Sequence, residues 1–430
     1  MKAPYRLFVL VAAAALWATL ASAQSTQSLT LQQAEQFAIQ NHPLIQAASS
    51  LASAARAQLT ETRSAYYPTV YGSLTGVGAE NNSRIAAGGL NNPIIYDRYS
   101  NGVTVTQLVT DFGRTHELVK SSDLHAQAQQ EGVITTRAQV LLQVDQSYFA
   151  ALKAQSVLAV AEETVKARQL VSDQVTELAK NKIRSDLDVN FANVNLAQAQ
   201  LLLIQAQNEL RSSFARLSAA LGSSDLTTYQ LADQPLPPPP ASDVAPLIQQ
   251  ALRDRPELVG QRLTLSSAQS FATAERDLKL PTVSALGTAG LTPVNESPLA
   301  PRYAAGGVNV DIPLFNGHLY GARETEAQSR AQAESQYLRG LQNQIVRDVQ
   351  TAWLDANAAF QRLSVTDRLL AEANQALDLA QGRYNLGLSS IIELTQAELN
   401  QTTARIEQAS AKYDYAAQHS LLSYQLGALR

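Results

Sequence analysis

The middle of the chain carries apolar and small side chains in steps of three and four. Leu141, Val144, Tyr148 and Ala151 show this spacing, which is typical of a helix that packs along a seam with other helices. No proline interrupts the segment, so the pattern predicts one helix over residues 114–180, about 100 Å long at ~1.5 Å per residue. A single globular core cannot bury such a helix. We therefore expect long helices that lie side by side as coiled coils.

A second pattern alternates apolar and polar side chains, as a strand with two different faces requires. The alternation is clean over Val308–Leu314, and Val103, Val105 and Val109 repeat it more weakly. Each of these strands follows a glycine-rich strand candidate and a loop rich in turn residues. The glycine-rich strands are expected at residues 69–79 and 282–291, and the loops at residues 80–102 and 292–307.

The chain contains two copies of one plan. Residues 38–45 match residues 251–258, and Pro68-Thr69-Val70 matches Pro281-Thr282-Val283 at the same spacing. Near the end of each copy, Leu221-Gly222 corresponds to Leu426-Gly427 at a slightly shorter spacing. Landmarks this widely spread predict a tandem duplication. Each copy is expected to run helix, strand, strand and long helix.

The two copies fix the expected domain boundaries. Residues 1–23 resemble an export signal, with Lys2 and Arg6 before an apolar stretch that is too short to span a membrane. We expect a first repeat over residues 24–222, a proline-rich linker over 223–242 and a second repeat over 243–430.

Four amphipathic strands cannot form a membrane structure alone, because an open sheet would leave unpaired edge amides in hydrocarbon. Closed barrels begin at eight strands, so strands from several chains have to be pooled. Two chains would give a narrow, filled cylinder, whereas three would give twelve strands and room for a conduit. The strands alone do not choose the number.

The composition argues against an enzymatic or metal-binding function. The chain has no cysteine, so disulfides, thiolate metal sites and cysteine nucleophiles are excluded, and a net charge of −4 does not suggest nucleic acid as a partner. The five histidines lie far apart without metal-ligand spacing. Asp111-Phe112-Gly113 matches a kinase magnesium motif, but no other kinase element accompanies it, so we expect a turn there. The sequence predicts no enzyme, no metal site and no cofactor.

Charged side chains crowd near the two expected helical-hairpin turns, in a chain that is otherwise sparse in charge. One interpretation is a solvated tip with ordinary helix caps. The other is a gate, a constriction held closed by hydrogen bonds and ion pairs between neighbouring hairpins. The candidate gate residues are Arg184, Asp186, Asp188, Tyr384 and Glu393.

The mature chain resembles the TolC-type outer-membrane efflux protein family (the outer membrane factors). The resemblance is carried by residues 38–45 and 251–258, by Leu314-Phe315-Asn316-Gly317, and by residues 383–390. It implies a mostly α protomer of a homotrimer, with four strands per chain in a shared 12-stranded β-barrel. It also implies long coiled-coil helices in a periplasmic α-barrel, and turns that dock a periplasmic adaptor protein. The implied docking residues are Lys182, Ile183, Ser185, Gly387, Leu388 and Ser390.

The sequence departs from the family pattern at both turns. Lys182 stands where glycine is expected, so we expect the two tips to differ in shape if Gly387 adopts a positive φ. The acidic pair that often follows the second turn is reduced to one acid, because Gln396 stands at the position of the other.

The leading hypothesis is a passive exit duct in the outer membrane, part of a tripartite efflux or type I secretion system. Its expected partners are two further copies, an adaptor, an inner-membrane pump and outer-membrane lipid. Drugs, metal ions and proteins all fit as cargo, since a wide polar tunnel selects weakly. The rival hypothesis is a periplasmic coiled-coil scaffold or adhesin without channel activity. An envelope hydrolase is a third possibility, but no assembled site supports it.

Overall fold

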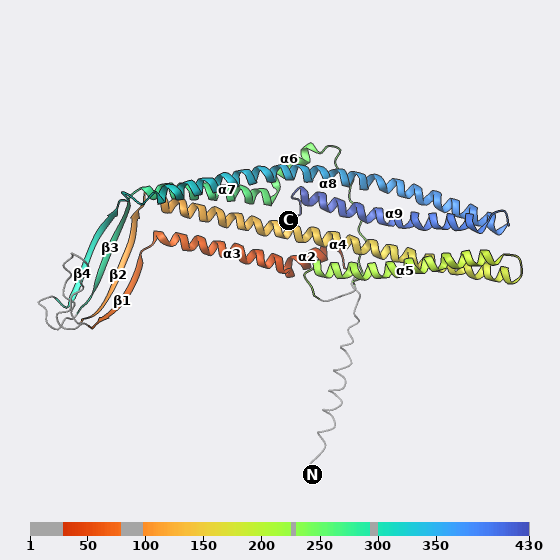
Figure 1. Ribbon diagram of the computed structural model, residues 1–430, viewed down its shortest axis with the longest axis horizontal. Helices are drawn as coiled ribbons and strands as arrows, with labels where there is room; N and C mark the ends of the chain where they lie inside the picture. The colour runs from red at the N-terminus through yellow and green to blue at the C-terminus, as the bar shows by residue number, and fades with distance from the viewer. Residues whose placement is uncertain (1–28, 79–97, 225–228, 293–299, 430) are drawn as a thin grey trace, which may run out of the picture.

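The computed structural model describes residues 29–78, 98–224, 229–292 and 300–429. The predicted signal peptide lies outside these ranges. A four-stranded sheet stands at one end of an elongated molecule, and two helical hairpins end at the other (Figure 1). Among the helices in the described ranges, none is long and apolar enough to cross a membrane.

The order of elements repeats once along the chain. The first run is α2 (Leu31–Asn41), α3 (Pro43–Arg63), η1 (Ser64–Tyr66), β1 (Thr69–Val77), β2 (Arg98–Thr110), α4 (Arg114–Lys180) and α5 (Asp186–Ala220). The second is α6 (Ala245–Asp254), α7 (Pro256–Arg276), η2 (Asp277–Lys279), β3 (Thr282–Leu291), β4 (Arg302–Asp311), α8 (Leu319–Asn385) and α9 (Ile391–Gln425). Both α4 and α8 have 67 residues, and both α5 and α9 have 35. The mostly helical fold is as predicted, and the exact repeat boundaries stay a prediction.

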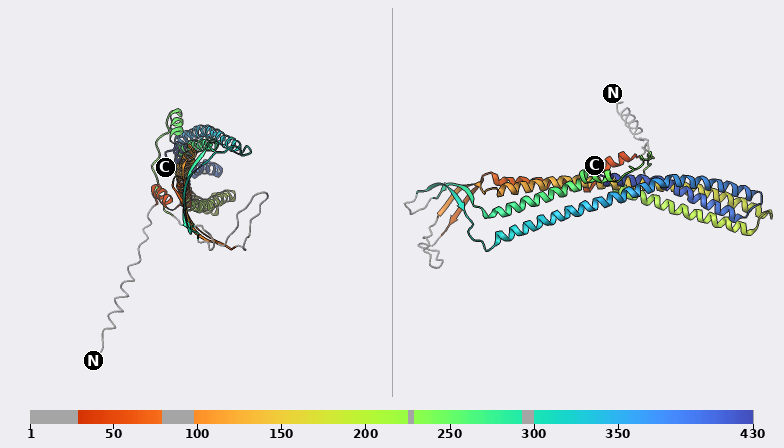
Figure 2. Two further views of the ribbon diagram at one scale, coloured as in Figure 1. Left: turned by 90° about the vertical axis from the view of Figure 1, so that its left-hand side faces the viewer. Right: turned by 90° about the horizontal axis from the view of Figure 1, so that it is seen from above.

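The sheet is an antiparallel meander in the order β1-β2-β3-β4, so β1 and β4 are its two edges. Seen along the long axis of the molecule, it is strongly curved (Figure 2). Both second strands begin earlier than predicted, because β2 starts at Arg98 and β4 at Arg302. Glycine, serine and asparagine give these segments low strand propensity. Pairing with β1 and β3 nevertheless holds them in the sheet.

The register gives the sheet one apolar face and one polar face. Val105 lies opposite Val70, and Val283 lies opposite Val310, with their side chains on the same face. The other face is mainly polar, since Thr104 lies opposite Thr288 and Thr282 opposite Asp311. A bulge between Leu108 and Thr110 shifts the register, so the regular alternation ends there and the place of Val109 on the apolar face stays a prediction.

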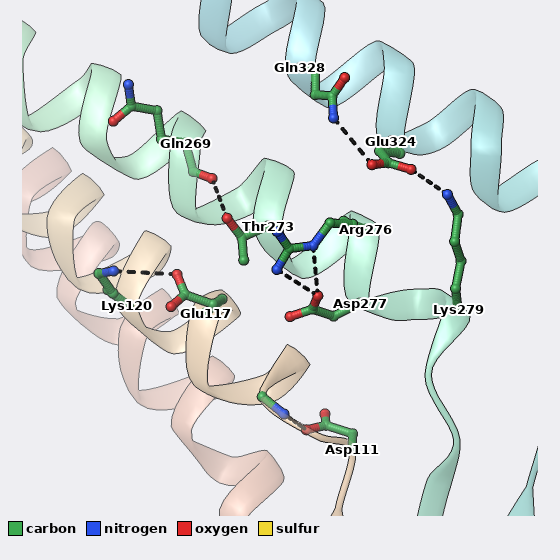
Figure 3. A network of polar contacts seen from close by, with 11 residues as sticks. Asp111, Glu117, Lys120, Gln269, Thr273, Arg276, Asp277, Lys279, Glu324 and Gln328 are labelled. Carbon is green, nitrogen blue, oxygen red and sulfur yellow. Dashed lines mark hydrogen bonds and ion pairs between the residues drawn. The ribbon is translucent and has the colours of Figure 1, made fainter.

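Charged and polar side chains form contacts at the helix ends that adjoin the sheet (Figure 3). Asp111 accepts hydrogen bonds from the backbone N–H and the hydroxyl of Thr115, at 2.7 and 2.6 Å, and so starts α4. The predicted turn at Asp111-Phe112-Gly113 is therefore confirmed. Arg276 pairs with Asp277 at 3.0 Å, and Lys279 pairs with Glu324 on α8. Each of these contacts stays within one copy, and all of them lie where the sheet meets the helices.

The N-terminal segment and the linker cross the helices near mid-length. Leu29 forms a parallel bridge with Leu231, and the Tyr148 hydroxyl lies 2.8 Å from the Leu29 carbonyl oxygen. Further along the linker, Trp353 Nε1 donates to the carbonyl of Ala241 at 2.8 Å. The largest apolar cluster, around Tyr148 and Leu217, lies at this level and joins α2, α4, α5 and α9.

Candidate gate and docking surface at the hairpin tips

Each hairpin ends in a turn of the same construction. In the α4–α5 turn, Ile183 N donates to Leu178 O at 2.9 Å and Lys182 N donates to Ala179 O at 2.8 Å. In the α8–α9 turn, Leu388 N donates to Arg383 O at 2.8 Å, with a matching inner bond from Gly387 N. This pair of bonds is the Schellman motif, which requires a left-handed residue just past the helix end.

The expectation that the two tips differ in shape is wrong. Lys182 has φ +61° and Gly387 has φ +73°, so both occupy the left-handed position. A side chain there costs about 1 kcal/mol relative to glycine. The hydrogen bonds of the motif and the cap of the following helix hold Lys182 in place despite that cost. The tips therefore share a backbone and differ in the side chain that they present.

The tips expose large apolar side chains. Ile183 is 65% exposed and Leu388 is 67% exposed, at equivalent positions of the two turns. Lys182, Ser185 and Ser390 lie beside them at the surface. Ser390 is the N-cap of α9, but its side chain forms no capping hydrogen bond.

Two of the five candidate gate residues join the hairpins directly. The Arg184 guanidinium carbon lies 4.1 Å from the centroid of the Tyr384 ring. Its NH2 nitrogen also donates to the Tyr384 carbonyl at 2.7 Å. Tyr384 is buried, and within the described ranges its hydroxyl has no hydrogen-bond partner. Within this chain the contact therefore uses the ring face and the backbone carbonyl of Tyr384 and not its hydroxyl.

The three acidic candidates form no ion pair between the hairpins in the described ranges. Asp188 belongs to the cap of α5, where its Oδ2 accepts from Ser185 N at 3.1 Å and from Ser185 Oγ at 2.9 Å. Burial raises the pKa of the Tyr384 hydroxyl, the Arg184 charge lowers it, and the Asp188 charge raises it further, so Asp188 acts on the site through its field. Asp186 is exposed in the first turn of α5. Glu393 pairs with Arg383 at 3.0 Å, within the α8–α9 hairpin.

The sequence reasoning missed a buried ion pair farther from the tips. Arg168 on α4 pairs with Glu398 on α9, and both side chains are almost fully buried. A signal for it was present, because Arg168 follows Ala161 by seven residues and so occupies a seam position of α4. A charge at such a position requires a partner from another helix.

Comparison with known proteins supplies the family. A sequence profile described as "Outer membrane efflux protein" matches residues 31–223 and 247–428. The chain is 22% identical to outer membrane protein TolC of Escherichia coli K12, over 94% of this chain and 83% of that protein. It is 24% identical to protein CyaE of Bordetella pertussis, over 92% of this chain and 83% of that protein.

A solved structure has the same fold. Outer membrane protein VceC of Vibrio cholerae superposes with a TM-score of 0.79 at 16% identity, covering 92% of this chain and 96% of that one. The predicted outer-membrane location and role in efflux are confirmed by the family match, which does not fit the scaffold or adhesin alternative. The chain belongs to the outer membrane efflux protein family.

Proposed function

We propose that three copies of this chain close into a passive duct, gated at the hairpin tips and opened by a periplasmic adaptor. The sheet end crosses the outer membrane, and the tips receive cargo from an inner-membrane pump. The chain itself catalyses no reaction, because its role is to provide a path.

The two-faced sheet with two free edges is the observation that carries this proposal. Its apolar face suits lipid and its polar face suits a water-filled lumen. The backbone groups at the β1 and β4 edges need partners inside a bilayer. Joining β4 of one copy to β1 of the next satisfies both edges at once, and three copies give twelve strands.

The outer helices of the two hairpins support the same assembly. Leu187, Val194 and Leu201 are exposed on α5 at intervals of seven residues, which is the spacing of a coiled-coil seam. On α8, Val365 and Leu369 are exposed one turn apart. About half of each side chain is still exposed, so burying the rest contributes roughly 1 kcal/mol per side chain. Packing α5 of one copy against α8 of the next would bury both rows.

The gate consists of the contact between Arg184 and Tyr384. It ties the α4–α5 hairpin to the α8–α9 hairpin at the tip itself. One such contact is weak, with a cation–π term of about 0.5–2 kcal/mol. Three copies of it would hold a resting state that an adaptor, binding at Ile183 and Leu388, can displace.

Single-channel conductance in planar bilayers tests the gate. We expect Arg184→Gln to raise the conductance of intact trimers, because it removes the charge that joins the hairpins. Arg383→Gln is the matched control, since its partner Glu393 lies in the same hairpin. Tyr384→Phe should change little, because the hydroxyl carries no contact. Equal conductance of Arg184→Gln and the control would return these residues to the role of a solvated tip.

A further inference from the structure

The buried ion pair lies at a defined distance from the tips. Arg168 is 12 residues before the end of α4, or about 18 Å along the helix axis. The pair links α4 to α9 and therefore links the two hairpins. Burial lowers the pKa of Arg168 and raises that of Glu398, and each charge offsets the shift of the other. Each charge is thus stable in this site only beside its partner.

The pair differs from the other ion pairs between the hairpins. Lys153 pairs with Asp414 at 2.8 Å and Glu163 pairs with Arg405 at 2.9 Å, nearer mid-length and in contact with solvent. Between Arg168–Glu398 and the tips, no further ion pair joins the hairpins in the described ranges. The space there is filled by a small apolar cluster of Val175, Ala192, Tyr384, Ile391 and Leu394.

Two hydrogen bonds between uncharged side chains join the helices near the ion pair. Asn195 Nδ2 on α5 donates to Thr395 Oγ1 on α9 at 2.8 Å, and Thr395 lies one turn from Glu398. Ser172 Oγ on α4 donates to Asn193 Oδ1 on α5, also at 2.8 Å. Side-chain bonds therefore join α4, α5 and α9 pairwise within a short stretch of the bundle.

We propose that the Arg168–Glu398 pair is the fixed point about which the hairpin tips separate when the duct opens. Moving the hairpins apart here would leave two unpaired charges in a buried site, which is strongly unfavourable. Between the pair and the tips, the apolar cluster makes no directional contact between the hairpins other than the Arg184–Tyr384 contact, which opening breaks, so this part can yield to a small tilt. Opening is then confined to the last ~20 Å of the α4–α5 hairpin and the last ~10 Å of the α8–α9 hairpin, where Glu398 lies seven residues after the start of α9. The pair is a positioning element, and the inference rests on the proposed gate.

Cross-linking at the level of the pair tests the fixed point. The chain has no cysteine, so Asn195→Cys with Thr395→Cys introduces two thiols that a short, reducible bifunctional thiol reagent can bridge. The bridge is made in the Arg184→Gln background. We expect the raised conductance of that variant to stay unchanged after bridging. A fall to the level of the wild type, reversed by reductant, would show that the hairpins part at this level and would overturn the proposal.

Changing the pair itself gives an independent result. Arg168→Met with Glu398→Met removes both charges while keeping volume, a change that often preserves stability. In this double variant, with Arg184 and Tyr384 unchanged, we expect the resting conductance to rise at least about twofold over that of the wild type. A bridge between cysteines at positions 195 and 395 should reverse the rise. The exchange Arg168→Glu with Glu398→Arg should keep the conductance of the wild type.

The outcomes separate the two proposals. If the Arg168→Met, Glu398→Met trimer has the same resting conductance as the wild type, the proposal of a fixed point is overturned and the proposal of the gate is unaffected. Failure of Arg184→Gln alone to raise conductance would remove the gate, and the fixed point with it.

Discussion

Asp145 offers a test of the packing at mid-length, because it is a buried carboxyl between helices. The residue lies on α4 and is 2% exposed. Burial is the main reason that its pKa rises from 3.8 to about 7; the Ser420 hydroxyl on α9 lowers it, and the Glu35 carboxylate on α2 raises it. One oxygen of Asp145 has no hydrogen-bond partner within the described ranges. The folded protein therefore holds this side chain protonated below about pH 7.

The magnitude follows from the two pKa values. A shift of roughly 3 units corresponds to about 4 kcal/mol. Two states are relevant: one in which α2 is docked on α4, and a lifted one in which α2 has moved away and Asp145 meets water. Below pH 4 the Asp145 carboxyl is protonated in both states, and the docking of α2 has its full stability. Between about pH 4 and pH 7 the lifted state releases the proton, so docking weakens by about 1.4 kcal/mol per pH unit. Above pH 7 both states are ionised and the loss is complete.

Hydrogen exchange of the α2 amides measures this local opening. The protection factor in the wild type should fall about tenfold per pH unit between pH 5 and pH 7. Asp145→Asn removes the ionisable carboxyl at this position, so the protection factor of the α2 amides should not change with pH in this variant. Glu163→Gln, an exposed carboxyl on the same helix, is the control and should follow the wild type. A profile in Asp145→Asn as steep as that of the wild type would refute the reasoning.

Three further predictions have definite expected outcomes. Lys182→Gly should stabilise the first tip by about 1 kcal/mol, seen as slower amide exchange there, and faster exchange would contradict the left-handed assignment. Val310→Arg should lower the amount of assembled trimer, because a charge facing lipid costs about 2–4 kcal/mol at mid-membrane and about 1 kcal/mol or less near the membrane surface, and Val310 is the penultimate residue of β4. Asn309→Arg should be tolerated, and equal amounts of assembled trimer would argue against two faces. Gly222→Ala should lower the melting temperature, because φ is +77° and the added Cβ would meet backbone at 2.9 Å, whereas Gly321→Ala, with open space around it, should not.

Much of the fold was predictable because it depends on local repetition. The helix from Arg114 to about residue 180 was predicted closely, since its period is uniform and no proline interrupts it. The starts of β2 and β4 were missed because their residues favour turns, and only partners far along the chain hold them in the sheet.

The tips show where sequence reasoning stops. A charged side chain at Lys182 argued against a left-handed turn, but the hydrogen bonds of the whole motif override that local preference. The partners of Arg184 and Arg168 lie two hundred or more residues away. Sequence spacing placed Arg184 and Tyr384 near the tips but could not say which of their atoms meet.

The central claim is that three copies form one duct, and the mass of the detergent-extracted protein tests it most directly. The mass should equal three mature chains, and cross-linking should give a ladder that ends at three. The physical reason is that a lone chain exposes both edges of its sheet and the apolar rows of α5 and α8. A folded, stable monomer in mild detergent would contradict the account.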